Sequence, residues 1–322
     1  MKKLSIIYLT ISLATNAFCQ TEKQLVPSDL KQQTIVTEPV TLRKGFFRAG
    51  TLLNYRVADK YFTGSGHKEY YVTSKWDTKS AYNLTLQYGL SDRFEINLIT
   101  EYMNAHLESQ STERVAGTNT TQTIVAKQKG LGFGDSHVSL NYQIIPEAKN
   151  KVSLTGMLNI TVPTGQKNPK NIKSANQYDL PVGNGTYVVG LALSARTILY
   201  PYSFTGFFGY TYNFAGTKII DATDLVQRKF KFGNRLEGGL SANLLLNEWI
   251  VLSNELNYYH EGDGMIDNVL SSRMPNSWAV SYEPNLIFQV KRFRLGESVK
   301  IPLKGINVPA DPLYVMMIQY VF

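Results

Sequence analysis

The chain has 322 residues and a formal net charge of +8; 18% of its residues are charged and 12% are aromatic. This aromatic content excludes an intrinsically disordered chain, and a mean hydropathy of −0.18 excludes a bundle of transmembrane helices. A transmembrane β-barrel fits both values, because outward apolar residues alternate along each strand with inward polar ones.

The first 19 residues have the parts of a secretory signal peptide. Two lysines follow Met1, a mostly apolar run extends from Leu4 to Leu13, and Ala17-Phe18-Cys19 ends the segment. The apolar run is too short to anchor the chain in a bilayer, so we predict a cleaved signal peptide over residues 1–19. A lipid-modified Cys19 is the alternative, although Phe18 is bulky where that processing requires a small residue. For an exported chain, we interpret the positive charge as favouring anionic lipid, and no nucleic acid is expected as a partner.

Residues 20–43 are polar and follow no period, so we predict a periplasmic N-terminal lead-in there. From residue 44 onward, apolar side chains recur at every second position, which is the period of a half-buried strand. A soluble β-sandwich shows the same alternation, so the rows alone do not decide the fold. The clearest rows lie within residues 82–88, 138–144, 152–162 and 236–244.

The connections between the rows separate a barrel from a sandwich. Tight turns near residues 90–92, 146–150, 200–203, 246–248 and 291–293 alternate with long polar segments at 58–79, 107–129, 165–183, 217–228 and 262–275. Short periplasmic turns alternating with long outer loops are typical of an outer-membrane barrel. We therefore predict an all-β fold, a transmembrane antiparallel up-and-down β-barrel over residues 44–322. About twelve strands are expected, and ten or fourteen remain compatible with the pattern. Their predicted ranges are 44–57, 80–89, 94–106, 130–145, 151–164, 185–199, 204–216, 229–245, 249–260, 276–290, 294–304 and 313–322.

The last predicted strand ends on an aromatic residue and alternates throughout. Its apolar row resembles the C-terminal signal by which bacterial barrels are recognised for insertion, so we predict the barrel-assembly machinery as a partner. Pairing of this strand with the first strand would remove the free sheet edge. The row consists of Tyr314, Met316, Ile318, Tyr320 and Phe322.

Three short motifs resemble a family of outer-membrane barrels named for a putative role in the meta-cleavage pathway of phenol degradation and often labelled simply "transporter". They are Gly130-Leu-Gly-Phe-Gly-Asp135 at a strand entry, Val162-Pro-Thr-Gly165 at a strand end, and the tyrosine-rich Tyr210-Thr-Tyr-Asn213. The resemblance covers roughly residues 45 to 322. It implies passage of small, often aromatic, molecules across the outer membrane.

The polar faces of the predicted strands carry charges of both signs. Charges that face a barrel interior either pair or line a water path, so the side chains form either a network that closes the barrel or a narrow selective pore. The candidate lumen-lining residues are Arg48, Arg56, Glu95, Glu101, His137, Arg196, Glu237, Glu255, Glu283 and Lys300.

We predict a channel or transporter for small solutes and no enzyme, and the family resemblance implies that these solutes include aromatic or hydrophobic molecules. The first alternative is a structural or surface-binding barrel in which the long loops are the working part. A lipid-acting enzyme built on His137, Ser139 and Asn159 is a weaker alternative, because the first two residues are expected to face the lumen rather than lipid. No motif predicts a cofactor or a metal site.

Overall fold

The computed structural model describes residues 41–70, 74–114, 121–146, 152–174, 177–220, 224–272 and 274–322. The predicted signal peptide and all but the last three residues of the predicted lead-in lie outside these residues. No helix among the described residues is long and apolar enough to cross a membrane.

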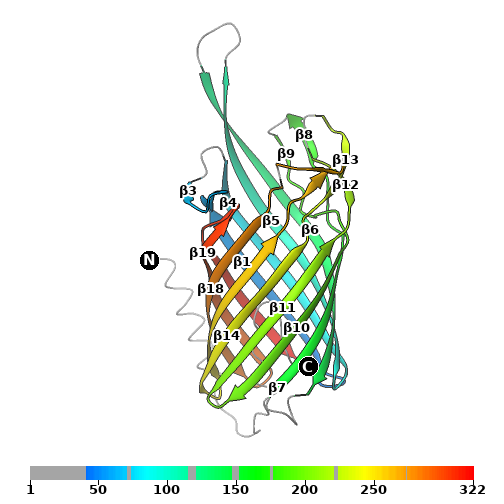
Figure 1. The fold of residues 1–322 in the computed structure, drawn as a ribbon, viewed down its shortest axis with the longest axis vertical. Coiled ribbons are helices and arrows are strands. Elements are labelled where there is room, and N and C mark those ends of the chain that lie inside the picture. The colour runs from blue at the N-terminus through cyan, green and yellow to red at the C-terminus, as the bar shows by residue number, and fades with distance from the viewer. Residues whose placement is uncertain are drawn as a thin grey trace.

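Twelve antiparallel strands form one closed barrel (Figure 1). The sequence prediction of an all-β barrel of about twelve strands is confirmed. Each wall strand pairs with its neighbour in the chain, and the last strand pairs with the first. In chain order they are β1 (Phe47–Ala58), β4 (Ser74–Ser91), β5 (Phe94–Arg114), β6 (Thr121–Ile145), β7 (Val152–Val162), β10 (Val188–Leu199), β11 (Tyr202–Asn213), β14 (Arg235–Asn247), β15 (Ile250–Glu261), β18 (Ser277–Val290), β19 (Phe293–Ile306) and β21 (Leu313–Val321).

The burial of side chains alternates along each wall strand. On β18, for example, Ser281, Glu283 and Asn285 are buried, whereas the residues between them are partly exposed. Polar side chains therefore point into the barrel and apolar side chains point outward, the reverse of a soluble domain. Leu191 and Leu240 on the outer face are 65% and 69% exposed, and such a surface requires a lipid environment.

One end of the barrel, the turn end, carries the short connections, and the opposite end, the loop end, carries the long ones. Exposed aromatic residues surround the turn end, as expected where a barrel wall meets the membrane interface. They include Tyr88, Tyr202, Phe204, Trp249, Phe293 and Phe322.

The loop end contains more regular structure than predicted. Residues 107–114 and 121–129 are strands rather than loop, because β5 and β6 stay paired from His106↔Lys129 to Arg114↔Thr121 and form a hairpin that rises above the wall (Figure 1). A cross-strand ion pair of 3.3 Å between Glu108 and Lys127 lies in this hairpin. The backbone hydrogen bonds of β5 and β6 continue beyond the membrane, where no apolar row is needed to mark the strands. The predicted ends of these two strands, at residues 106 and 130, were therefore wrong.

The other predicted loops also contain short strands. They form three small sheets at the loop end, which apolar periodicity could not reveal because the strands have two to five residues. The sheets comprise β20 (Val308–Pro309), β2 (Lys60–Phe62) and β3 (Lys68–Tyr70); β8 (Lys170–Ser174) and β9 (Gln177–Asp179); and β12 (Gly216–Ile219), β13 (Gln227–Lys231), β16 (Met265–Ile266) and β17 (Val269–Leu270).

The seam between β1 and β21 closes the barrel. Eight residue pairs join the two strands, from Arg48↔Val321 to Tyr55↔Tyr314. The rings of Phe47 and Phe322 lie 5.6 Å apart on the outer side of this seam. The predicted pairing of the last strand with the first is therefore present.

Candidate functional site

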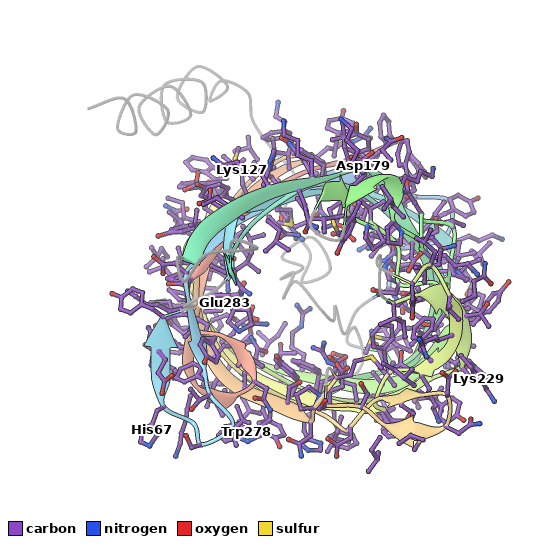
Figure 2. All side chains as sticks on the ribbon, turned by 90° about the horizontal axis from the view of Figure 1, so that it is seen from above. His67, Lys127, Asp179, Lys229, Trp278 and Glu283 are labelled. Carbon is purple, nitrogen blue, oxygen red and sulfur yellow. The ribbon has the colours of Figure 1, made fainter. Side chains whose placement is uncertain are left out.

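The interior of the barrel is the candidate site, and the structure places all ten predicted lumen-lining residues on inward-facing positions of the wall. Figure 2 looks along the barrel axis and labels Glu283 on the inner side of the wall. Antiparallel order sorts the ten residues into three levels. Arg48, Glu95 and Arg196 lie near the turn end, Glu255, Glu283 and Lys300 lie midway, and Arg56, Glu101, His137 and Glu237 lie toward the loop end.

The charges near the turn end are buried and hydrogen-bonded. Arg48 is 4% exposed and donates through Nη1 to Gln87 Oε1 at 3.0 Å. Glu95 is 1% exposed, and its Oε1 accepts a hydrogen bond of 3.1 Å from Asn141 Nδ2. Hydrogen bonds to a buried charge offset part of its desolvation cost, so these groups stabilise a packed interior.

The chain that precedes β1 contributes to the same packed region. The backbone N–H of Leu42 donates to Glu95 Oε2 at 2.6 Å, and Thr41 Oγ1 donates to the carbonyl oxygen of Asp92 at 3.2 Å. Thr41 and Leu42 are 4% and 5% exposed. Residues 41 and 42, predicted as part of a periplasmic lead-in, therefore bind at the turn end of the interior rather than extending away from the barrel.

Two carboxyl groups face each other midway along the interior. Glu255 and Glu283 are directly paired across β15 and β18, and both are buried. Asn285 Nδ2 donates to Glu255 Oε1 at 3.2 Å, and Ser298 Oγ donates to Glu283 Oε1 at 2.7 Å. Lys300 lies within electrostatic range of both carboxyl groups. Like charges directly opposite each other on neighbouring strands destabilise a sheet, so this pair depends on its neighbours.

The charges toward the loop end are more accessible. Arg235 lies on the inward row of β14 and forms a 3.0 Å ion pair with Glu237; the two side chains are 38% and 23% exposed. The guanidinium of Arg235 also lies 4.4 Å from the ring centre of Tyr259. Sequence reasoning missed Arg235, although it stands two residues before Glu237 in the same inward row.

His137 and Ser139 bond to different partners, which does not match a catalytic pair. His137 Nδ1 lies 2.8 Å from Thr161 Oγ1, and Ser139 Oγ donates to Asn159 Oδ1 at 2.7 Å. Among the described residues, no group of three or more His, Cys, Asp or Glu side chains could hold a metal ion.

Asp135 holds together the motifs that carried the family resemblance. Its carboxylate accepts hydrogen bonds from the backbone N–H groups of Gly165 at 3.1 Å and Asn184 at 2.7 Å. A Cβ atom on Gly165 would lie 2.7 Å from Gly183 Cα and 2.8 Å from the Gly134 carbonyl carbon, so only glycine allows this approach. Gly165 and Asn184, at the two ends of a long connection, are thereby held against β6 at the loop end.

A partly buried cation lies near this junction. Lys218 Nζ lies 4.5 Å and 5.0 Å from the ring centres of Phe230 and Phe232. Burial lowers the pKa of Lys218, and the negative charge of Asp135 opposes that change. The sequence analysis named Asp135 only as the last residue of a motif and did not identify Lys218, because the spacing of these residues along the chain does not indicate their contacts.

The small polar residues of the interior are closely covered. Ser153, Thr155 and Ser194 are 0% exposed, and Thr205 and Ser253 are 4% and 2% exposed. These side chains are too short to reach one another across a twelve-strand barrel, and a wide water-filled pore would leave them accessible. The inward rows toward the turn end therefore form a packed polar layer on the barrel wall.

No protein-family model matches the chain, and no curated protein matches it either. The fold is similar to that of the COG4313 outer membrane channel from Pseudomonas putida F1, with a TM-score of 0.66, 15% sequence identity, and coverage of 88% of this chain and 97% of that chain. The toluene transporter TbuX from Ralstonia pickettii aligns with a TM-score of 0.44, 7% identity, and coverage of 87% and 90% of the two chains. The CymD monoaromatic hydrocarbon channel aligns with a TM-score of 0.43, 8% identity, and coverage of 87% and 88%. The first of these likenesses shows that the chain has the fold of an outer-membrane barrel.

Proposed function

We propose that the protein is an outer-membrane channel that allows small solutes to cross through its interior. The observation that carries the proposal is the closed barrel with an apolar outer face and an interior lined by charged and polar side chains. A structural barrel needs no inward row of ten ionisable groups, because each of them costs desolvation free energy.

We infer that the buried side chains at the turn end, together with Thr41 and Leu42, restrict this channel. Passage requires the contacts of Thr41 and Leu42 with the interior to be released, or the solute to be small enough to pass beside them. The motif resemblance to the phenol meta-pathway family supports small aromatic or hydrophobic molecules as the solutes. An open diffusion pore for large hydrophilic solutes does not agree with the covered interior.

Single-channel recording in a planar bilayer tests the proposal. Discrete conductance steps are expected from the refolded protein, and Glu101→Lys is expected to shift ion selectivity toward anions, because it reverses a charge on the inward row of β5. Glu69→Lys on the exposed strand β3 is the matched control and should leave selectivity unchanged. A silent bilayer containing folded, inserted protein would contradict the channel function.

We also propose that the chain reaches the outer membrane through a cleaved signal peptide and is assembled by recognition of its last strand. Tyr314, Ile318, Tyr320 and Phe322 are exposed on the outer face of β21. Phe322→Ala should reduce the amount of assembled barrel in cells several-fold while leaving refolding from urea into detergent intact. Tyr200→Ala, at a residue of the turn end that is 81% exposed, is the control and should assemble normally.

The β5–β6 hairpin supports a second candidate function, the binding of an external partner. It extends beyond the wall and has no part in closing the barrel. Deletion of residues 108–127 should leave conductance unchanged if the interior is the working part. If the hairpin is the working part, the deletion should abolish the biological activity while lumen charge changes have no effect.

A further inference from the structure

We propose that a groove on the outer wall of the barrel, around Glu297, binds a small molecule that has an apolar body and one O–H or N–H donor. The site is distinct from the interior and would be occupied within the membrane.

Glu297 is a charged residue in an outward-facing apolar row. Around this position on β19, Arg294, Gly296 and Ser298 are buried, whereas Glu297 is exposed. Its paired residues are Leu286 on β18 and Met316 on β21, which also point outward. On these three strands, the outward positions of the membrane-facing part are otherwise uncharged among the described residues.

A hollow in the wall surrounds this carboxyl group. A groove of about 460 Å³ is lined on the outer side by Leu53, Leu252, Leu286 and Met316 together with Glu297. The pairing of β18 with β19 is interrupted beneath it, between Tyr282↔Ile301 and Asn285↔Ser298. Pro284 lies in the interruption and has no N–H to donate to the ladder, which gives the local cause of the hollow.

The carboxyl group lacks a partner of its own there. Within the parts of the chain that the structure describes, no group forms a hydrogen bond or an ion pair with the side-chain carboxyl group of Glu297. A carboxyl group in hydrocarbon costs free energy unless a donor compensates it, and an intramembrane ionisable residue marks a functional site by default. An acyl chain fills a groove but cannot supply that donor.

The depth of Glu297 in the membrane favours a small solute over a lipid headgroup as the molecule bound in the groove. Glu297 lies four residues beyond Phe293, which is exposed at the turn end. With about 3.4 Å per residue and a strand tilt of about 40°, its Cα lies roughly 10 Å above the level of Phe293. Interfacial aromatic residues lie at the headgroup level, so a headgroup amine would have to enter the hydrocarbon to reach this carboxyl group. A free small molecule can occupy that depth.

Fluorine NMR on the full-length barrel in lipid nanodiscs tests the proposal. The probe is 4-fluorophenol, and its O-methyl ether 4-fluoroanisole is the matched molecule without a donor. The wild-type protein should broaden the 4-fluorophenol signal saturably above the background of empty discs. Glu297→Leu should weaken that binding at least about tenfold, because it removes a hydrogen bond to a charged acceptor. The weaker binding of 4-fluoroanisole should not change in this variant.

Two further variants distinguish binding in the groove from binding elsewhere on the outer wall. Leu286→Trp fills the groove and should abolish binding of 4-fluorophenol, whereas Leu84→Trp, on the outward row of β4, should leave it unchanged. All variants are first checked for heat-modifiable mobility in gels, which reports a folded barrel.

The proposal is overturned if wild-type protein shows no saturable binding, if 4-fluoroanisole binds as well as 4-fluorophenol, or if Glu297→Leu binds like the wild type. It is also overturned if native mass spectrometry finds that the wild-type protein, but not Glu297→Leu, retains a phospholipid or a second copy of the chain. Conductance of Glu297→Leu should equal that of the wild type, so this site and the proposed channel can fail independently.

Discussion

The two ends of the barrel interior hold their charges in different ways. Near the turn end, Arg48 and Glu95 are at most 4% exposed and are tied into hydrogen bonds with side chains and with the chain that precedes β1. Toward the loop end, Arg235 and Glu237 are paired with each other but keep 38% and 23% of their side-chain surface exposed. We infer that the turn end limits passage and that the loop end selects what enters.

Removal of the chain that precedes β1 should have the largest effect. A variant that retains the signal peptide but lacks residues 21–42 loses the contacts of Thr41 and Leu42 with the turn end. Its single-channel conductance is expected to rise several-fold in a planar bilayer, because Thr41 and Leu42 are buried at the turn end of the interior. A deletion of residues 108–127 is the control for chain shortening. Equal conductance of the truncated and intact proteins would place the restriction elsewhere.

The next largest effect is expected at the loop end, from Asp135. Asp135→Ala removes the acceptor of two backbone hydrogen bonds that fix residues 165–184. The free energy of unfolding in lipid vesicles should fall by about 1–3 kcal/mol, since two partly buried N–H groups lose their partner. Limited proteolysis should also cut this segment sooner. Asp135→Asn keeps one acceptor oxygen and should lie between the wild type and the alanine variant; an alanine variant as stable as the wild type would show that the junction does not depend on this carboxylate.

A smaller effect of opposite sign is expected midway between the ends. Glu283→Gln removes one of two directly opposed carboxyl groups and keeps an oxygen that can accept from Ser298. The free energy of unfolding should rise by up to about 1 kcal/mol, because like charges across a strand pair repel. Urea titration in vesicles measures the change. A loss of stability instead would indicate that the negative charge of Glu283 is needed to stabilise the positive charge of Lys300.

The smallest effect on stability is expected from Glu237→Gln, which breaks the exposed ion pair with Arg235. The expected loss is below about 1 kcal/mol, because water screens a pair of this exposure. The same variant should nevertheless shift ion selectivity measurably toward anions, since it leaves Arg235 without its counter-charge at the loop end. Reversal potentials in a salt gradient measure that shift, and a shift equal to that of Glu248→Gln at a periplasmic turn would argue against selection by the loop end.

The wall of the barrel was predictable because one rule governs it. Every second residue faces lipid, so rows such as Tyr82, Leu84, Leu86 and Tyr88 report both the strand and its outer face. The same rule fails where lipid ends. The strands of the β5–β6 hairpin continue through residues 107–114 and 121–129 with polar side chains, and no period distinguishes them from a loop.

The junctions inside the barrel could not be predicted, because they join segments far apart in sequence. Asp135 accepts hydrogen bonds from the backbone N–H groups of Gly165 and Asn184. The distances between these residues along the sequence follow no pattern from which the contact could be predicted. Glu297 is a different case. The row Leu295, Glu297, Val299 and Ile301 carries the signal in the sequence itself, since one carboxylic acid interrupts an otherwise apolar outward face.

The seam between β1 and β21 determines when the barrel can close. Arg48 pairs with Val321, so the first wall strand has no partner on one side until the last residues of the chain have been synthesised and exported. Contacts between such distant residues form slowly, because the loop that they close is almost the whole chain. During that interval two strand edges and an apolar face are open to aggregation. A chain of this topology is therefore protected from aggregation at these edges only once β21 has paired with β1.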